Sequence, residues 1–129
     1  MSANTRLVED FIAMWEEPGG LDRAVEAYFT PDTVWVNEGL TRTTGIGEAL
    51  EVNRMFGEKL GMDSIKVDML SSAEDGYKVL TERVDHMIDA NGNVLLSAPV
   101  MGTFEIEDGK IAAWRDYFDS RGALAAQSG

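Results

Sequence analysis

Apolar residues recur at intervals of three and four through much of the first sixty residues. This spacing predicts amphipathic helices over residues 7–15, 21–29 and 47–60, each with one face covering an apolar surface. Asn4 or Thr5 is available to cap the first helix. Each helix is followed by a residue that ends helices, namely Pro18, Pro31 and Gly61.

A short alternating run separates the second and third helices. Residues 33–37 are rich in β-branched and aromatic side chains, so we expect a strand there. A strand would place Thr33, Trp35 and Asn37 on one face. The segment from Gly39 to Gly45 begins and ends with glycine, and we expect it to be a loop.

The second half of the chain changes to strand patterns separated by hairpin turns. The turn dipeptides are Asp75-Gly76, Asn91-Gly92 and Asp108-Gly109. They predict four antiparallel strands near 63–74, 77–90, 93–107 and 110–118. Pro99 and Gly102 mark a kink or an edge in the third of these strands. Ser120 to Ala126 reads as a small-residue helix or a frayed tail.

Helices followed by a long antiparallel meander are typical of the α+β class. We expect the helices to cover the concave face of a strongly curved sheet. The chain has 129 residues, 44% of them hydrophobic, which predicts one domain over residues 1–129.

Composition narrows the classes of function. A net charge of −12 repels phosphate backbones and anionic lipids, so binding to nucleic acid or to a membrane surface is not expected. The chain has no cysteine, which excludes disulfides and thiolate sites and fits a reducing cytoplasm. No apolar stretch approaches the length that spans a bilayer, so we expect a cytoplasmic protein.

Charged residues interrupt two of the alternating strands. Arg83 and Asp85 share one face of the second strand of the meander, and Asp116 lies between Trp114 and Phe118 on one face of the fourth. A buried charge is costly unless it is paired. Two carboxylates and a guanidinium brought together would balance most of that cost, and would supply an acid, a base and a bridge.

Tight hairpins would bring these residues close together. The strands carrying Arg83 and Asp116 would then be separated by a single strand, a backbone distance of roughly 10 Å. The intervening strand offers the small residues Ala98, Val100 and Gly102 at this level. Simpler interpretations stay open, because Asp116 could pair with a surface lysine and Arg83 with Asp85 on a solvated face.

The single histidine, His86, lies on the opposite strand face from Asp85. No serine and carboxylate are expected beside it, so a catalytic triad is not predicted and His86 is interpreted as a surface residue. No spaced cluster of His, Cys or Asp suggests a metal site or a metal cofactor.

These segments resemble the limonene-1,2-epoxide hydrolase family, whose members have the nuclear-transport-factor-like cone fold. The matching words are Thr81-Glu82-Arg83-Val84-Asp85, Gly102-x-Phe104, Asp108-Gly109-Lys110-Ile111 and Trp114-Arg115-Asp116-Tyr117-Phe118-Asp119. The resemblance implies a mixed, mostly antiparallel sheet curved into a cone, and a homodimer formed through the outer sheet face.

The resemblance also implies a cofactor-independent epoxide hydrolase that gives a vicinal diol in one step. Asp116 would be the general base, Asn37 would help to hold the water, Asp85 would be the general acid and Arg83 would bridge the carboxylates. A hydrophobic epoxide, terpene-like or cyclic, would fill a pocket whose walls are Trp35, Met87, Ala98, Val100 and Phe118. The family has a water-binding tyrosine where this chain has Trp35, and an indole can donate a hydrogen bond but cannot accept one.

Two alternatives remain open for the same fold. One is a proton-transfer enzyme like ketosteroid isomerases or polyketide cyclases, with Asp116 as the base. The other is a non-catalytic binder of apolar ligands, in which Trp35 fills the water site. The fold alone does not separate these functions.

Overall fold

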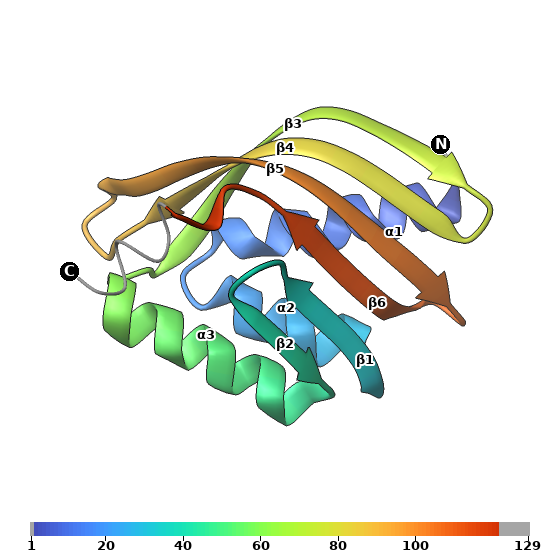
Figure 1. Ribbon diagram of the computed structural model, residues 1–129, viewed down its shortest axis with the longest axis horizontal. Helices are drawn as coiled ribbons and strands as arrows, with labels where there is room; N and C mark the ends of the chain where they lie inside the picture. The colour runs from blue at the N-terminus through green and yellow to red at the C-terminus, as the bar shows by residue number, and fades with distance from the viewer. Residues whose placement is uncertain (1, 122–129) are drawn as a thin grey trace.

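The computed structural model describes residues 2–121, which form helices followed mainly by strands (Figure 1). The elements in chain order are α1 (Ala3–Ala13), the 3-10 helix η1 (Met14–Glu16), α2 (Gly20–Tyr28), β1 (Phe29–Asn37), β2 (Thr41–Thr44), α3 (Ile46–Leu60), β3 (Ser64–Asp75), β4 (Lys78–Ile88), β5 (Val94–Glu107) and β6 (Lys110–Tyr117). The four strands predicted for the meander are confirmed to within two residues. Of the segment predicted over 120–126, residues 122–126 lie outside the described part.

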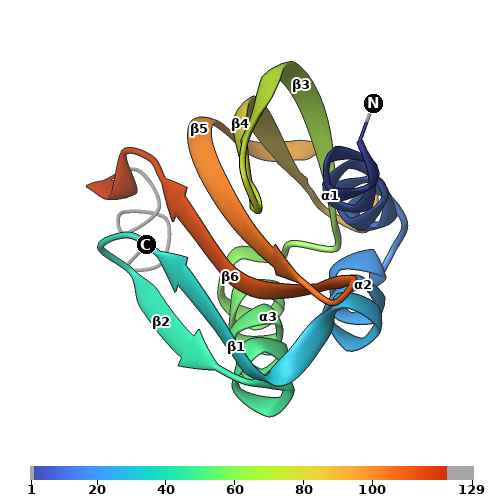
Figure 2. The same ribbon diagram turned by 90° about the vertical axis from the view of Figure 1, so that its right-hand side faces the viewer.

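The six strands form one mixed sheet in the order β2-β1-β6-β5-β4-β3. Neighbouring strands are antiparallel except β1 and β6, which run parallel. The sheet is strongly curved, and the helices lie on its concave side (Figure 2). The predicted α+β architecture is therefore confirmed, and β5 is the single strand between β4 and β6.

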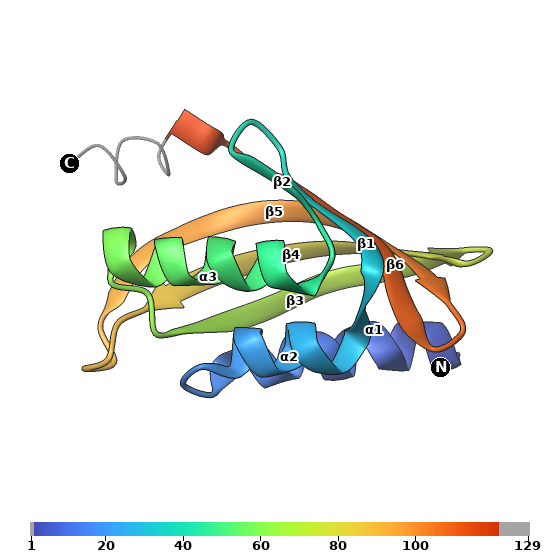
Figure 3. The ribbon, with the colours of Figure 1, turned by 90° about the horizontal axis from the view of Figure 1, so that it is seen from below.

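The helices lie against the inner face of the sheet (Figure 3), and their apolar side chains join those of the sheet in one core. Phe11 of α1 lies at the centre of the core, with ring centroids 5.5 Å from Trp15 and 5.2 Å from Trp114. Such edge-to-face contacts between aromatic rings stabilise a core beyond the area that they bury. No helix in residues 2–121 is long and apolar enough to cross a lipid bilayer.

Three expectations about the N-terminal half were wrong in detail. Ser2, two or three residues earlier than expected, caps α1 by accepting a hydrogen bond from the backbone N–H of Thr5 at 3.2 Å. β1 begins at Phe29 and passes through Pro31, which a register shift between Phe29 and Val34 accommodates. The expected loop over 39–45 contains β2, whose four polar residues show no apolar alternation and are held by pairing with β1.

Pro99 and Gly102 lie in different environments within β5. β6 pairs with β5 only from Met101 onward, so Pro99 lies where β5 has one neighbour, as expected for an edge position. Gly102 is paired on both sides, with Thr81 of β4 and Asp116 of β6. The edge expected at Gly102 is therefore wrong, and the strand pairing shows no register shift there. The reason for a glycine at this position lies in the site described below.

Candidate active site

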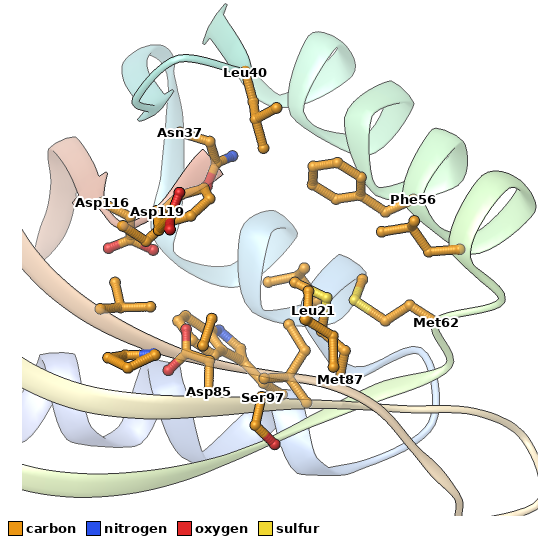
Figure 4. Close-up of a pocket in the computed structure, with 18 of the residues that line it drawn as sticks. Leu21, Asn37, Leu40, Phe56, Met62, Asp85, Met87, Ser97, Asp116 and Asp119 are labelled. Carbon is orange, nitrogen blue, oxygen red and sulfur yellow. The ribbon is translucent and has the colours of Figure 1, made fainter. Parts of the chain in front are cut away.

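A cavity of about 380 Å3 lies between the inner face of the sheet and α3 (Figure 4). All five residues expected to form its walls do line it, namely Trp35, Met87, Ala98, Val100 and Phe118. The helical side contributes further apolar residues that the sequence analysis did not assign to a pocket, namely Leu21, Phe56, Leu60 and Met62. The helical periodicity around Leu21 and Phe56 had indicated only that they are buried, and Met62 lies just beyond the end of α3.

Polar side chains gather at one end of this cavity. Asn37 and Asp116 lie on neighbouring parallel strands as direct partners, and both line the cavity together with Asp85. Figure 4 shows Asn37 and Asp116 on one side and Asp85 across from them, with Met62 and Met87 toward the apolar end. The cavity therefore has one polar end, and its remaining walls are mostly apolar.

Arg83 bridges the two carboxylates and is completely buried. Its Nε and Nη2 donate to Oδ1 and Oδ2 of Asp85 at 3.0 and 2.9 Å. Nη1 and Nη2 donate to Oδ1 and Oδ2 of Asp116 at 3.2 and 2.9 Å, and Nη1 also donates to the Thr81 hydroxyl at 3.0 Å. A guanidinium has five N–H bonds, so each one has an acceptor and the burial of this charge is compensated.

Aromatic rings surround the rest of the guanidinium. The carbon at its centre lies 5.5 Å from the ring centroid of Trp15 and 5.9 Å from that of Phe104. Burial favours the neutral form, but the carboxylates of Asp116 and Asp85 outweigh it and raise the pKa of Arg83. The guanidinium is therefore a permanent positive charge between two acids.

Asp116 is buried and its protonation is perturbed. Burial raises the pKa of Asp116 above that of an ordinary aspartate, against the opposing effect of Arg83. The negative charge of Asp85 raises the pKa further, whereas a hydrogen bond from the Trp114 indole at 2.8 Å lowers it. Asp116 is therefore a buried carboxyl group whose ionised form is disfavoured by its surroundings and is stabilised mainly by Arg83.

Asn37 is held in place by the hairpin that follows it. Its Nδ2 donates to the Thr41 hydroxyl at 3.0 Å, and the backbone N–H of Leu40 donates to its carbonyl oxygen at 2.8 Å. The side-chain oxygen of Asn37 has no protein donor among residues 2–121, which leaves it available to a molecule in the cavity. Thr41 was not predicted as part of the site, because it lies in the segment read as a loop.

Trp35 lies beside this end of the cavity but presents no polar atom to it. Its indole nitrogen is buried and finds no hydrogen-bond acceptor within the described residues. Its ring stacks on Trp114, with centroids 4.7 Å apart and planes at 9°. Trp35 therefore contributes the face of its ring rather than its N–H.

Thr81 and Gly102 complete the floor of the site. The Thr81 hydroxyl donates to the carbonyl oxygen of Gly102 at 3.2 Å while it accepts from Arg83. A Cβ atom on Gly102 would lie 2.4 Å from both Nη1 of Arg83 and Oδ1 of Asp116. Gly102 thus allows the two charged side chains to meet above the central strand, which accounts for a glycine in a doubly paired strand.

His86 has neighbours that the sequence analysis did not expect. Its Nδ1 lies 2.7 Å from the Ser97 hydroxyl and its Nε2 lies 2.8 Å from Oδ2 of Asp68, so the expectation of no serine and carboxylate beside it was wrong. These groups lie on the outer face, where the Ser97 hydroxyl points away from the cavity (Figure 4). Asp68 is exposed, and neither His86 nor Asp68 lines the cavity, so the three residues form a hydrogen-bond chain on the surface.

No group of three or more potential metal ligands is present in residues 2–121. The cavity instead offers a carboxylate with a raised pKa, a second carboxylate and an amide oxygen around one open space. Such a set can remove a proton from water and donate a proton to a leaving oxygen.

Known proteins are similar to this chain in sequence and in fold. A family model described as the limonene-1,2-epoxide hydrolase catalytic domain matches residues 2–128. Epoxide hydrolase EphG from Mycobacterium tuberculosis is 36% identical over 95 residues, which are 74% of this chain and 60% of that protein. The chain thus spans less than two thirds of the length of this relative.

Solved structures extend the similarity to the whole fold. The structure of an LEH-like epoxide hydrolase from M. tuberculosis has a TM-score of 0.75 and 31% identity, covering 98% of this chain and 90% of the other. A SnoaL-like polyketide cyclase from Jannaschia sp. CCS1 has a TM-score of 0.76 at 17% identity, covering 98% and 92%. The second similarity is one of fold alone.

Proposed function

This chain belongs to the limonene-1,2-epoxide hydrolase family, and we propose that it hydrolyses a hydrophobic epoxide to a vicinal diol in one step without a cofactor. The observation that carries the proposal is the Arg83 guanidinium bound to both Asp85 and Asp116 at the polar end of an otherwise apolar cavity. The residues that do the chemistry and the nature of the substrate are part of the proposal.

Water is the nucleophile in this mechanism. The side-chain oxygen of Asn37 accepts one hydrogen bond from the water, and Asp116 accepts the other proton as the water oxygen attacks an epoxide carbon. Thr41 keeps the amide of Asn37 oriented. Holding the water against the substrate in this way lowers the entropic part of the barrier.

Asp85 is the acid on the other side of the epoxide. As the carbon–oxygen bond breaks, Asp85 gives its proton to the leaving oxygen, which becomes the second hydroxyl of the diol. Arg83 keeps the two carboxyl groups apart and lowers the cost of having one of them ionised in the cavity. Transfer of the proton from Asp116 back to Asp85 restores the starting state.

The walls of the cavity support an apolar substrate. Apart from Asn37, Ser97 and the three aspartates Asp85, Asp116 and Asp119, the lining consists of aliphatic, aromatic and thioether groups, including Phe56, Met62 and Met87. Thioethers adapt their shape to irregular hydrocarbon groups. At the packing density of protein interiors, about 0.74, a cavity of this size holds roughly 280 Å3 of molecule.

Isotope labelling tests the reaction. Incubation of the enzyme with cyclic and terpene epoxides in H2(18)O should give diol that carries one solvent oxygen, including in a single turnover with enzyme in excess. Label in the aspartate carboxyl groups, with unlabelled diol in the first turnover, would contradict the one-step mechanism. Exchange of solvent deuterium into a ketone, without epoxide turnover, would instead support the proton-transfer alternative.

We also propose that the chain forms a homodimer through the outer face of the sheet. Leu80, Met101 and Tyr117 project from three neighbouring strands on this face, and each is at least 40% exposed. Exposed apolar patches of this kind commonly mark an interface.

Light scattering after size exclusion should give twice the mass of the chain, and Met101→Glu should shift the mass toward the monomer. Tyr77→Ser removes an exposed aromatic residue from the β3–β4 turn and should leave the mass unchanged. A monomer for the unmodified chain would refute the proposal.

A further inference from the structure

Trp114 is held between two aromatic rings from neighbouring strands. Trp35 of β1 and Phe104 of β5 are both its cross-strand partners. Their ring centroids lie 4.7 and 5.6 Å from that of Trp114, with planes at 9° and 17°. Near-parallel rings from both sides fix the plane of the indole, and with it the direction of the indole N–H.

The indole N–H of Trp114 differs from those of the other tryptophans. It donates to Oδ1 of Asp116 at 2.8 Å, from two residues away on the same strand face. The indole nitrogens of Trp15 and Trp35 are equally buried but have no acceptor in the part of the chain that the structure describes. Three buried tryptophans thus share the site, and one of them binds the base.

The two oxygens of Asp116 are not equivalent because of this contact. Oδ1 accepts from Nη1 of Arg83 and from Trp114, whereas Oδ2 accepts only from Nη2 of Arg83. A carboxylate oxygen accepts about two hydrogen bonds. Oδ1 is therefore fully used by the protein, and Oδ2 keeps an acceptor position.

We propose that Trp114 is a positioning residue that occupies Oδ1 of Asp116 and so makes Oδ2 the oxygen that takes the proton from water. The inference rests on the proposed hydrolysis. It also gives Trp35 a role through its ring face, because Trp35 packs on the indole that contacts the base.

The N–H of Trp114 stabilises the ionised form of Asp116. The charged groups that face Asp116 are Arg83 and Asp85 of β4, and Asp119, which lines the same cavity and is paired with Arg121. Loss of the N–H leaves these charges in place and removes one donor to the anion, so the pKa of Asp116 rises further. The base acts only when ionised, so activity is lost as the pH falls through this pKa.

Two matched substitutions test the proposal by kinetics. In the unmodified enzyme, the acid limb of the pH profile of kcat/KM should have its midpoint at a pH above the pKa of an ordinary aspartate. Trp114→Phe keeps a ring in the stack but deletes the N–H, and should move this limb upward by about one pH unit and lower kcat roughly tenfold or more. Trp15→Phe likewise replaces an indole with a smaller ring, beside Arg83, but deletes no hydrogen bond. This control should leave the midpoint of the acid limb unchanged.

Nuclear magnetic resonance of 15N-labelled indoles gives a readout that needs no turnover. The chain has three tryptophans, so three indole signals are expected. The signal lost in Trp114→Phe should be the one that moves with pH, and Asp116→Asn should abolish this movement. An unmoved Trp114 signal, or an equal shift of the acid limb in Trp15→Phe, would overturn the proposal. Absence of epoxide turnover would refute the proposed function alone, since the titration of Trp114 is measured independently.

Discussion

Replacing Asp116 with asparagine should lower kcat by about 10²- to 10⁴-fold, the range typical for loss of a general base. Asparagine has nearly the same shape and can still accept from Trp114, but its amide cannot take a proton from water. Steady-state turnover of an epoxide, with circular dichroism to verify folding, measures the effect. Full activity in this variant would refute the assignment of Asp116 as the base.

Asp85→Asn should cause a loss of similar size, because an amide cannot protonate the leaving oxygen. Asp68→Asn is the matched control, since Asp68 is an exposed carboxylate on the outer face of β3 and contacts His86 rather than Arg83. We expect this control to keep normal turnover. Equal losses in all three variants would indicate a general effect of charge rather than two specific roles.

Replacing Gly102 with alanine should be among the most destabilising single substitutions in the chain. The added methyl group would meet Arg83 and Asp116 at 2.4 Å, with the Thr81 hydroxyl at 3.1 Å. Overpacking together with separation of a buried ion pair should lower the free energy of unfolding by about 3 kcal/mol. Turnover should fall at least about 100-fold, because the side chains of Asp116 and Arg83 are displaced together.

Gly47→Ala provides the control for Gly102→Ala. Gly47 lies in the first turn of α3, where an added Cβ meets nothing within 4 Å. Alanine is favoured over glycine in helices by up to about 1 kcal/mol, so this variant should be unchanged or slightly more stable. Urea denaturation of both variants measures the difference. An unaltered unfolding midpoint in Gly102→Ala would show that the site tolerates the methyl group.

The meander could be predicted from the sequence because its signals are local. Each hairpin has a turn dipeptide between alternating strands, and these fix strand order and side-chain direction together. This is why Arg83, Asp85 and Asp116 could be expected on one face with a single strand between them. β2 could not be predicted, because its strand conformation depends on pairing with β1 rather than on its own residues.

The parts of the site that escaped prediction depend on tertiary packing. The position of Phe56 in the cavity wall follows from how α3 packs over the sheet, which helical periodicity does not specify, and Met62 lies in the connection that follows α3. Gly102 was interpreted from the sequence as a kink or an edge, because the sequence does not show that the side chains of Arg83 and Asp116 occupy the space above it. Thr81 also escaped prediction, but it could have been found from the sequence, because its position two residues before Arg83 places it on the same strand face.

The parallel pairing of β1 with β6 joins Asn37 to Asp116 from distant parts of the chain. Arg83 and Asp85, in contrast, lie on one strand of a local hairpin meander. During synthesis, Asp85 and Arg83 can therefore meet early, whereas Asp116 and Asn37 meet only after β6 has left the ribosome. Such non-local contacts form slowly because closing a long loop costs entropy. Refolding should accordingly restore the hairpins before it restores enzymatic competence.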